Sequence, residues 1–352
     1  MWTETQVLRE DLERICAAEY VPWDMLRGKT IFITGATGLI GSTIVNALLY
    51  ANRQKSLGLQ ILALVRNERK AYRKFDAQLK SGNDLHFIVG TVENLPTISQ
   101  PIDYIIHGAS QTASRAFAES PVETIRTALV GTENMLKLAQ EKQVSKFVYL
   151  SSMEVYGQIY EEKLLSEEDV GYLNPLSLRS SYPESKRMCE NLCVSYFKQY
   201  NVPIVIARLA QTFGVGIEKN DQRVFAQFAR CAIKGENIVL ATNGESTRMY
   251  VYTMDAAAAI LVLLLKGCPG QAYNVANKNT YSSIIEMAKM VATHFSHKKS
   301  CVQIQTNSSI ANKLYPPHTH LKLDVSKIES LGWHATVDLP EMYERMIRGM
   351  RF

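Results

Sequence analysis

The chain has 352 residues, of which 46% are hydrophobic and 21% charged, an ordinary composition for a globular protein. This length predicts about two domains, or one large domain with a smaller lobe attached. The formal net charge of +5 is spread along the chain without a run of five or six like charges. Composition therefore indicates neither a nucleic-acid-binding protein nor a membrane-surface protein.

The sequence shows no targeting signal and no metal-binding pattern. The first residues, MWTETQVLREDLERIC, lack the basic and then apolar layout of a signal peptide. The longest apolar run, 256–265, is about half as long as a bilayer-spanning helix and predicts a core helix. The cysteines lack the spacing of metal ligands, and Cys189 and Cys193 are expected as reduced thiols on one helical face. We therefore expect a cytoplasmic protein that binds no metal.

Residues 1–28 precede the first expected strand. Apolar residues in 8–16 recur at helical spacing, and Thr3 with Gln6 could form a capping box at the start of that helix. Pro22 would prevent the helix from continuing. We expect an N-terminal helical extension that packs on the body of the protein.

From residue 30 the chain alternates between short apolar runs and longer amphipathic segments. The runs expected as strands are 30–34, 60–65, 85–90, 103–107, 146–151 and 203–208. The segments expected as helices include 39–53, 121–143 and 182–200. Short, nearly continuous apolar runs are typical of strands buried on both faces. The alternation predicts an α/β fold over residues 29–208, a Rossmann domain with a doubly wound parallel sheet.

After residue 208 the expected elements become shorter and richer in Gly, Asn and Pro. We interpret residues 209–352 mostly as a smaller C-terminal α/β substrate lobe, with some strands or helices returning to the Rossmann domain. The lobe would lie on the carboxyl ends of the strands, where doubly wound sheets bind their ligands.

The first expected strand runs directly into a glycine-rich turn. Gly35 allows the tight turn, Gly38 lets the backbone approach a pyrophosphate, and Gly41 lets the next helix pack closely on the strand. The N–H groups and the dipole at the start of that helix attract phosphate. A strand, this turn and a helix in succession predict a dinucleotide site. Its predicted residues are Gly35, Thr37, Gly38, Leu39, Ile40 and Gly41.

The end of the second expected strand bears on the choice between NAD and NADP. A carboxylate there would bind the ribose hydroxyls of NAD, but the sequence reads Val65-Arg66-Asn67. An arginine suits the 2′-phosphate of NADP instead. The sequence favours NADP and leaves NAD open, because Arg66 could also stack on the adenine or face the solvent.

A second motif indicates catalysis. Ser152 follows the fifth expected strand, and Tyr182 and Lys186 lie four residues apart farther along the chain. That spacing places phenol and ammonium on one helical face. This positive charge, with an oxidised nicotinamide adding to it, would lower the pKa of Tyr182 and make it a usable base near neutral pH. A Tyr-x-x-x-Lys motif is common by chance, so its weight comes from following the glycine-rich turn and the serine.

These motifs resemble those of the extended short-chain dehydrogenases/reductases known as NAD-dependent epimerases/dehydratases. The segments TGATGLIGS, SSMEVYG, SYPESK, RLAQTFGVG, RMYVYTMD and LDVSKIESLGW occur in the family's order over residues 29–350. Within the family, NPLSLRSSYPESKR is most similar to UDP-glucuronate decarboxylases and related sugar-nucleotide dehydratases. The resemblance implies a nucleoside diphosphate sugar as substrate and a homodimer formed through helices near 121–143 and 182–200.

The resemblance also implies roles for the site residues. Tyr182 would remove a proton from a sugar hydroxyl, usually at C4, while the hydride moves to the nicotinamide. Lys186 would hold the nicotinamide ribose, and Ser152 would hydrogen-bond the reacting oxygen. Ala109 and Ser110 are assigned to the cofactor site.

Four further positions concern the substrate. Arg248 would pair with substrate phosphates, because its fork binds oxyanions. Met153 stands where 4,6-dehydratases carry an aspartic acid that protonates the departing hydroxyl, and a thioether cannot donate a proton. Glu154 matches the acid of dehydratases and decarboxylases and could take a proton from a carbon beside the ketone. Gln211 replaces the family's usual asparagine.

The sequence therefore predicts an NAD(P)-dependent enzyme that oxidises a hydroxyl of a nucleoside diphosphate sugar to a transient ketone and later returns the hydride, as in epimerisation. The main alternative is an NADPH-dependent reductase of a nucleotide-linked keto sugar, which Arg66 and Met153 favour. A UDP-glucuronate decarboxylase and an inactive dinucleotide-binding protein are further alternatives. The intact Ser152, Tyr182 and Lys186 argue against the inactive protein.

Overall fold

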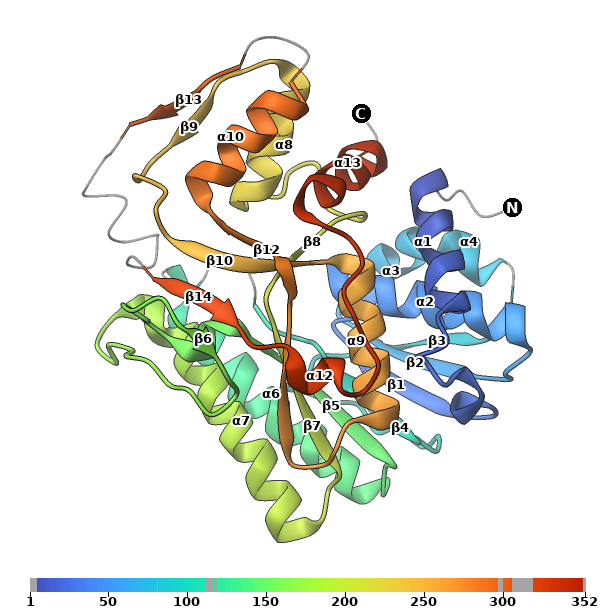
Figure 1. Cartoon of the computed structure of the whole chain (residues 1–352). Coiled ribbons are helices and arrows are strands. Elements are labelled where there is room, and N and C mark those ends of the chain that lie inside the picture. Colours follow the sequence, from blue (N-terminus) through green and yellow to red (C-terminus); the bar gives the residue numbers. More distant parts are fainter. Residues whose placement is uncertain are drawn as a thin grey trace.

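The computed structural model describes residues 5–80, 82–111, 117, 119–296, 300–305 and 319–350. In this part of the chain a large parallel sheet is covered by helices on both faces, and a smaller lobe lies beyond the ends of its central strands (Figure 1). The fold is thus the predicted α/β Rossmann architecture with a second, smaller sheet.

The larger sheet has seven strands among the described residues, and all of its pairs are parallel. Their order is β11 (Gln271–Val275), β7 (Ile204–Leu209), β5 (Lys146–Ser152), β4 (Tyr104–His107), β1 (Thr30–Thr34), β2 (Gln60–Val65) and β3 (Leu85–Val89). The six predicted strands are present, each within one residue of its expected bounds. The seventh, β11, was not predicted, because Asn and Gln interrupt its apolar run.

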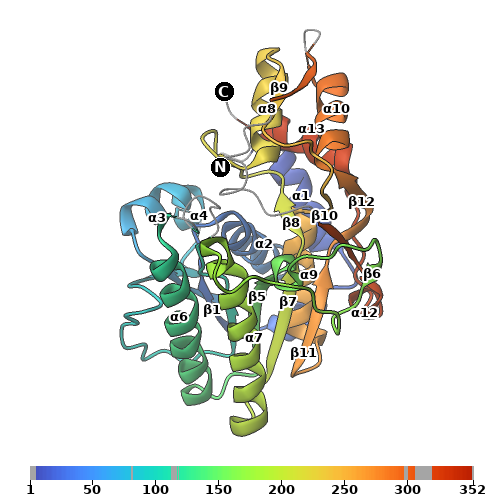
Figure 2. The same cartoon turned by 90° about the vertical axis from the view of Figure 1, so that its left-hand side faces the viewer.

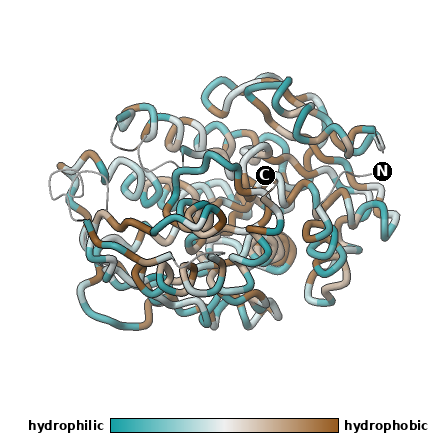
Figure 3. The backbone as a smooth tube through the Cα atoms, turned by 90° about the horizontal axis from the view of Figure 1, so that it is seen from above, coloured by the Kyte–Doolittle hydropathy of each residue, from teal (hydrophilic) through white to brown (hydrophobic). Residues whose placement is uncertain are grey.

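Helices cover the two faces of this sheet separately, and alternate residues of β1 show the division. Ile31 and Ile33 pack with α2 (Leu39–Lys55) and α9 (Thr253–Lys266) in one buried cluster. Phe32 packs in a second cluster, under α6 (Pro121–Glu141) and α7 (Ser181–Tyr200). Figure 3 shows the hydrophobic segments gathered toward the middle of the molecule.

The apolar run 256–265 lies within α9 and is completely buried, as predicted for a core helix. No helix in the described ranges is long and apolar enough to cross a membrane. Short helices complete this part of the molecule: η1 (Trp23–Leu26), α3 (Glu68–Lys74), α4 (Asp76–Leu79), η2 (Met153–Tyr156), η3 (Leu178–Ser180) and α12 (Ser326–Glu329).

The smaller lobe is built around a mixed sheet with the order β12 (Asn277–Ser283), β10 (Thr247–Tyr252), β14 (His320–Leu323) and β6 (Leu164–Leu165). Strand β8 (Gln211–Phe213) also pairs with β10, and the β10–β12 pair is antiparallel. The remaining lobe elements are α8 (Val224–Lys234), β9 (Ile238–Leu240), α10 (Ile284–His294), β13 (Val302–Ile304) and α13 (Leu339–Gly349).

The N-terminal extension forms α1 (Gln6–Ala17), which packs against α2, α9 and α13 (Figure 1). The expected capping box is wrong. The cap is Thr5, whose side chain accepts a hydrogen bond from Leu8 N, so Gln6 is the first helical residue. The predicted partner Thr3 lies outside the described residues.

A buried carboxylate attaches this helix to the lobe. Asp11 accepts hydrogen bonds from the Tyr252 hydroxyl at 2.5 Å and from Arg345 at 3.1 Å. Burial raises the pKa of Asp11 to about 6, although the hydrogen bond from Tyr252 opposes the rise. The extension therefore ties β10 and α13 to the Rossmann side of the molecule.

A larger buried network lies beneath the carboxyl ends of the central strands. Arg208 on β7 donates from Nε and Nη2 to the Glu190 carboxylate of α7, at 2.8–3.2 Å. Ser151 Oγ donates to the same carboxylate at 2.5 Å. Arg208 Nη1 donates to the Tyr156 hydroxyl, which in turn donates to Asn274 Oδ1 on β11 at 2.7 Å. Three strands, α7 and η2 are thereby joined by one charged pair.

We predict that Glu190→Ala lowers the free energy of unfolding by about 3–5 kcal/mol, because it leaves the Arg208 guanidinium buried without its counter-charge. Chemical denaturation followed by circular dichroism measures the change. The control is Glu13→Ala, which breaks the exposed Arg9–Glu13 pair and should cost less than about 1 kcal/mol. Equal losses in the two variants would contradict a supporting role for the buried pair.

Candidate active site

The glycine-rich turn connects β1 to α2, and its geometry requires glycine. Gly35 has φ +71°, and a Cβ added there would lie 2.7 Å from Gly108 O. A Cβ on Gly41 would lie 2.2 Å from Gly35 O. Gly38 is the N-cap of α2, and no side chain caps that end of the helix. The first N–H groups of a long helix are thus left for an anion.

A hollow of about 160 Å³ lies beside this turn. It is lined by Thr37, Gly38, Leu39, Lys70, Lys74, Gly216, Ile217, Glu218, Asp221 and Arg223. Ile40 follows in the first turn of α2 and is half-buried. Open N–H groups, glycines that admit a close approach and cations in the lining fit the phosphates of a dinucleotide. Two of these cations, Lys70 and Arg223, pair with carboxylates of the same lining.

A buried hydrogen-bonded group supports this turn from below. Thr34 Oγ1 accepts hydrogen bonds from Gly108 N and Ala109 N, at 3.2 and 3.1 Å. It also bonds His107 Nδ1 at 2.7 Å, and burial lowers the pKa of His107 to about 3. The ends of β1 and β4 are thereby held together, which places Ala109 beside the glycine turn, followed by the half-buried Ser110. Sequence reasoning did not identify His107 or Thr34.

Arg66 lies directly after β2 and is exposed. Its charge helps to lower the pKa of Glu93, although burial of Glu93 opposes that effect. The following helix, α3, carries Lys70 and Lys74 into the wall of the hollow. Burial lowers the pKa of Lys74. The adenosine end of the expected dinucleotide site is therefore rich in cations.

The predicted catalytic residues meet at the carboxyl end of β5. Ser152 ends the strand, and its Oγ accepts a hydrogen bond from Glu154 N at 3.2 Å. Tyr182 and Lys186 lie one turn apart on α7 and are buried, with Lys186 Nζ 5.8 Å from the centre of the Tyr182 ring. Lys186 Nζ donates to Leu150 O at 2.7 Å.

The pKa of Tyr182 differs from the sequence expectation. Burial raises it, the nearby Glu154 carboxylate raises it further, and a hydrogen bond with Ser152 and the charge of Arg179 oppose the rise. Burial also lowers the pKa of Lys186 to about 8. The predicted lowering counted the neighbouring ammonium and the oxidised nicotinamide, but it left out the cost of burying a phenolate.

Glu154 has a partner that sequence reasoning missed. From η3, Arg179 Nη2 donates to both Glu154 oxygens, at 3.0 and 2.8 Å. Arg179 Nε is buried without a hydrogen-bond partner. The guanidinium lies 4.9 Å from the ring centre of Phe117, which stacks on the Tyr182 ring at 4.3 Å. An ion pair therefore stands directly beside the expected base.

The three predicted substrate residues lie on three different elements. Met153 is buried in η2 and offers no proton donor. Gln211 begins β8 and is half-buried. Arg248 lies on β10, and its Nε is buried without a hydrogen-bond partner among the described residues. A buried donor of this kind is costly unless a ligand satisfies it.

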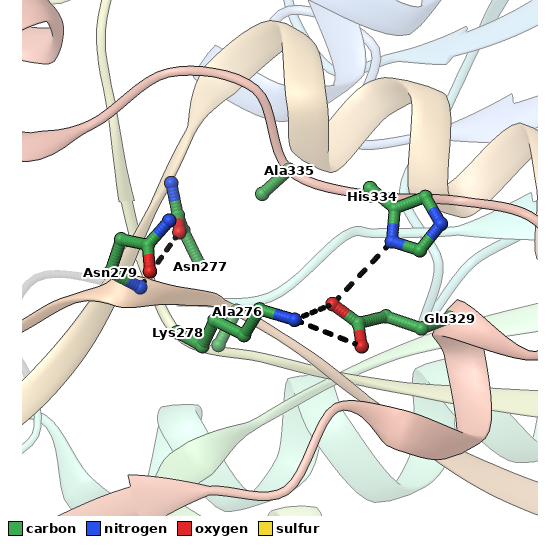
Figure 4. Close-up of a pocket in the computed structure, with 7 residues that line it drawn as sticks. All are labelled: Ala276, Asn277, Lys278, Asn279, Glu329, His334 and Ala335. Carbon is green, nitrogen blue, oxygen red and sulfur yellow. Dashed lines mark hydrogen bonds and ion pairs between the residues drawn. The ribbon is translucent and has the colours of Figure 1, made fainter.

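A smaller hollow of about 70 Å³ lies in the lobe, between β12 and the segment after α12 (Figure 4). There Glu329 accepts from Lys278 Nζ at 2.9 Å and faces His334 Nδ1 at 3.5 Å. None of its lining residues belongs to the predicted cofactor or catalytic set. No group of three possible metal ligands occurs within the described residues.

Comparison with known proteins agrees with this geometry. Residues 31–276, more than half of the chain, match the model of the NAD dependent epimerase/dehydratase family. The chain is 29% identical to UDP-glucuronic acid decarboxylase 1 of Xenopus tropicalis over 97% of this chain and 77% of that protein. It is 26% identical to human dTDP-D-glucose 4,6-dehydratase over 94% and 93% of the two chains.

Solved structures show the same fold. UDP-glucuronic acid 4-epimerase from Bacillus cereus in complex with NAD matches with a TM-score of 0.75 at 22% identity, over 91% of this chain and 98% of that one. An epimerase from Methanothermobacter thermautotrophicus matches with a TM-score of 0.75 at 22% identity, over 93% of each chain. Together with the family match and the glycine turn, these findings show that the chain belongs to the NAD-dependent epimerase/dehydratase family.

Proposed function

We propose that this protein oxidises a hydroxyl of a nucleoside diphosphate sugar to a transient ketone and then returns the hydride, so that the cofactor is regenerated in each turnover. The observation that carries the proposal is the meeting of Ser152, Tyr182 and Lys186 at the end of β5, in a fold whose glycine turn suits a dinucleotide.

A bound nicotinamide dinucleotide supplies hydride acceptance and return. Side chains of the protein remove and return the proton of the sugar hydroxyl. Tyr182 takes the proton of the sugar hydroxyl, and Ser152, which shares a hydrogen bond with Tyr182, holds the reacting oxygen. Lys186 presents an ammonium close to the phenol. These groups form a base whose proton can be returned to the same oxygen.

Two arginines support an anionic substrate. The Nε atom of Arg248 on β10 is buried and has no partner among the described residues, which suits a diphosphate. The Nε atom of Arg179, beside Tyr182, is likewise buried and unpartnered among these residues. Relatives are named for UDP-glucuronic acid. UDP-glucuronate is therefore the first substrate to test, and 4-epimerisation and decarboxylation are the first products to look for.

The rival function is reduction of a nucleotide-linked keto sugar by NADPH. Met153 favours it, because no acid stands at the position used for 4,6-dehydration. Arg66 and the lysines of α3 favour NADP over NAD. A preference for NADP over NAD is compatible with either function, and we propose it for both.

We further propose that the protein works as a homodimer in the cytoplasm. Helices α6 and α7 lie side by side on one side of the molecule (Figure 2). Both expose large apolar side chains, including Val122, Ile125 and Met188. A pair of such helices can form an isologous four-helix contact with a second copy.

The first prediction of the proposed function concerns the cofactor. NADP should bind more tightly than NAD, because a charge-assisted contact from Arg66 to the 2′-phosphate contributes about 1.5–3 kcal/mol. Arg66→Ala should abolish this preference, whereas Arg69→Ala, three residues along, should keep it. Calorimetric titration of both dinucleotides measures the affinities. Equal affinities in the wild type would refute the assignment.

The second prediction concerns the base. Tyr182→Phe removes only a hydroxyl, so the fold and dinucleotide affinity should persist while turnover falls about 100-fold or more. The same titrations and a chromatographic assay of nucleotide-sugar products measure the two effects. Near-normal turnover in this variant would show that another group acts as base.

The third prediction concerns Glu154. If a later step removes a proton from carbon, Glu154→Gln should abolish product formation while single-turnover hydride transfer to the cofactor remains measurable. Product made by the wild type in deuterated water should then carry deuterium on a sugar carbon. An unlabelled product together with an active Glu154→Gln variant would exclude proton removal from carbon. Simple 4-epimerisation or reduction would then be the remaining reactions.

A further inference from the structure

Glu154 and Arg179 form an ion pair beside Tyr182, and the proposed function leaves open how this pair affects the ionisation of that phenol. Glu154 and Arg179 come from two short turns, η2 and η3, that flank the start of α7. Both side chains are largely buried, with exposed fractions of 28% and 14%. One nitrogen, Arg179 Nη2, reaches both carboxylate oxygens. Water therefore screens this pair less than it screens a surface pair.

Among the described residues, the charged groups that act on the phenol are Arg179 of η3 and Glu154 of η2, and Lys186 Nζ on α7 lies 5.8 Å from its ring centre. Ser152 approaches it from β5, and Phe117 stacks on its ring. Tyr149 of β5 also packs beside Lys186 Nζ, at 4.7 Å from its ring centre. Glu154 is the negative charge in this set, and Arg179 is the charge bonded directly to it.

We propose that Arg179 is a positioning residue that neutralises Glu154 beside Tyr182, so that the phenol can ionise while the carboxylate stays within the site. The proposal rests on the proposed function only in taking Tyr182 as the base. Without Arg179, an uncompensated carboxylate would oppose the phenolate. Without Glu154, an unpaired guanidinium would favour it. The two residues should therefore shift the ionisation of Tyr182 in opposite directions.

The electrostatic effects that act on Tyr182 agree in sign with this geometry. The carboxylate of Glu154 raises the pKa of the phenol, and the guanidinium of Arg179 lowers it. A charge within about 4–6 Å commonly moves a pKa by 1–3 units. Replacing an arginine that had only a structural role would change the stability of the fold. It would not shift the pKa of Tyr182 in the direction opposite to the shift caused by replacing Glu154.

The test is a double-mutant cycle read on the phenol itself. Wild type, Arg179→Gln, Glu154→Gln and the double variant are labelled with carbon-13 at the tyrosine Cζ atoms and saturated with the oxidised dinucleotide. The Tyr182 resonance is assigned by its loss in Tyr182→Phe, and its ionisation is followed by NMR as the pH rises. No substrate is required, so a failure of the proposed reaction and a failure of this proposal are separate results.

We expect Arg179→Gln to move the midpoint of Tyr182 ionisation upward by about one pH unit or more. Glu154→Gln should move it downward by a similar amount. The double variant should return close to the wild type, because positions 154 and 179 together again carry no net charge. Arg179→Lys, which keeps the charge, should also stay close to the wild type.

Arg187→Gln is the matched structural control. Arg187 braces the same turn by donating to Val155 O at 2.7 Å, and it has no ion pair with Glu154. Its loss should weaken the fold without raising the midpoint as Arg179→Gln does. An unchanged midpoint in Arg179→Gln, or a double variant that remains shifted, overturns the proposal. An equal upward shift in Arg187→Gln would also overturn it, because loosening of the turn would then explain the effect.

Discussion

The buried pair of Arg208 and Glu190 is the contact on which the rest of the site depends. The pair joins β7 to α7, and its carboxylate accepts a hydrogen bond from Ser151 of β5. Its guanidinium is linked to Asn274 of β11 through the Tyr156 hydroxyl. Helix α7 carries the base and its lysine, and β5 ends in the serine, so the pair fixes these elements relative to one another. A buried charge pair is a weak source of net stability, but it allows few alternative arrangements of its neighbours.

The site that these elements hold combines groups that favour negative charge with a group whose negative form is disfavoured. The glycine turn and Arg248 offer donors to phosphates, whereas Tyr182 lies in a buried environment that disfavours its charged form. Such a base becomes effective only when positive charge is added or negative charge is compensated. The bound oxidised cofactor can supply the first effect, and the Glu154–Arg179 pair the second. Proton removal would then be tied to the presence of cofactor.

Much of the fold was predictable, because strands buried on both faces leave continuous apolar runs and the glycine turn has a local cause. β11 was missed because its apolar run is interrupted by Asn274, which serves the buried network rather than the hydrophobic core. The short sequence motifs of the site could be recognised, but the residues that bond to them could not. His107 and Arg179 act across long sequence separations. The spacing of Tyr182 and Lys186 along the helix carries no information about burial, which raises the pKa of Tyr182.

The central claim is that one hydride leaves the sugar and returns to it. A UDP-glucuronate labelled with deuterium at the oxidised carbon, C4 in the first instance, tests this claim most directly. Mass spectrometry would follow the label in the nucleotide sugar and in the dinucleotide during single and multiple turnovers. The account predicts that deuterium passes transiently to the cofactor and is found again on C4 of the product, with no net consumption of cofactor. Product formed without any transfer of label, or with one reduced dinucleotide consumed per product, would contradict it.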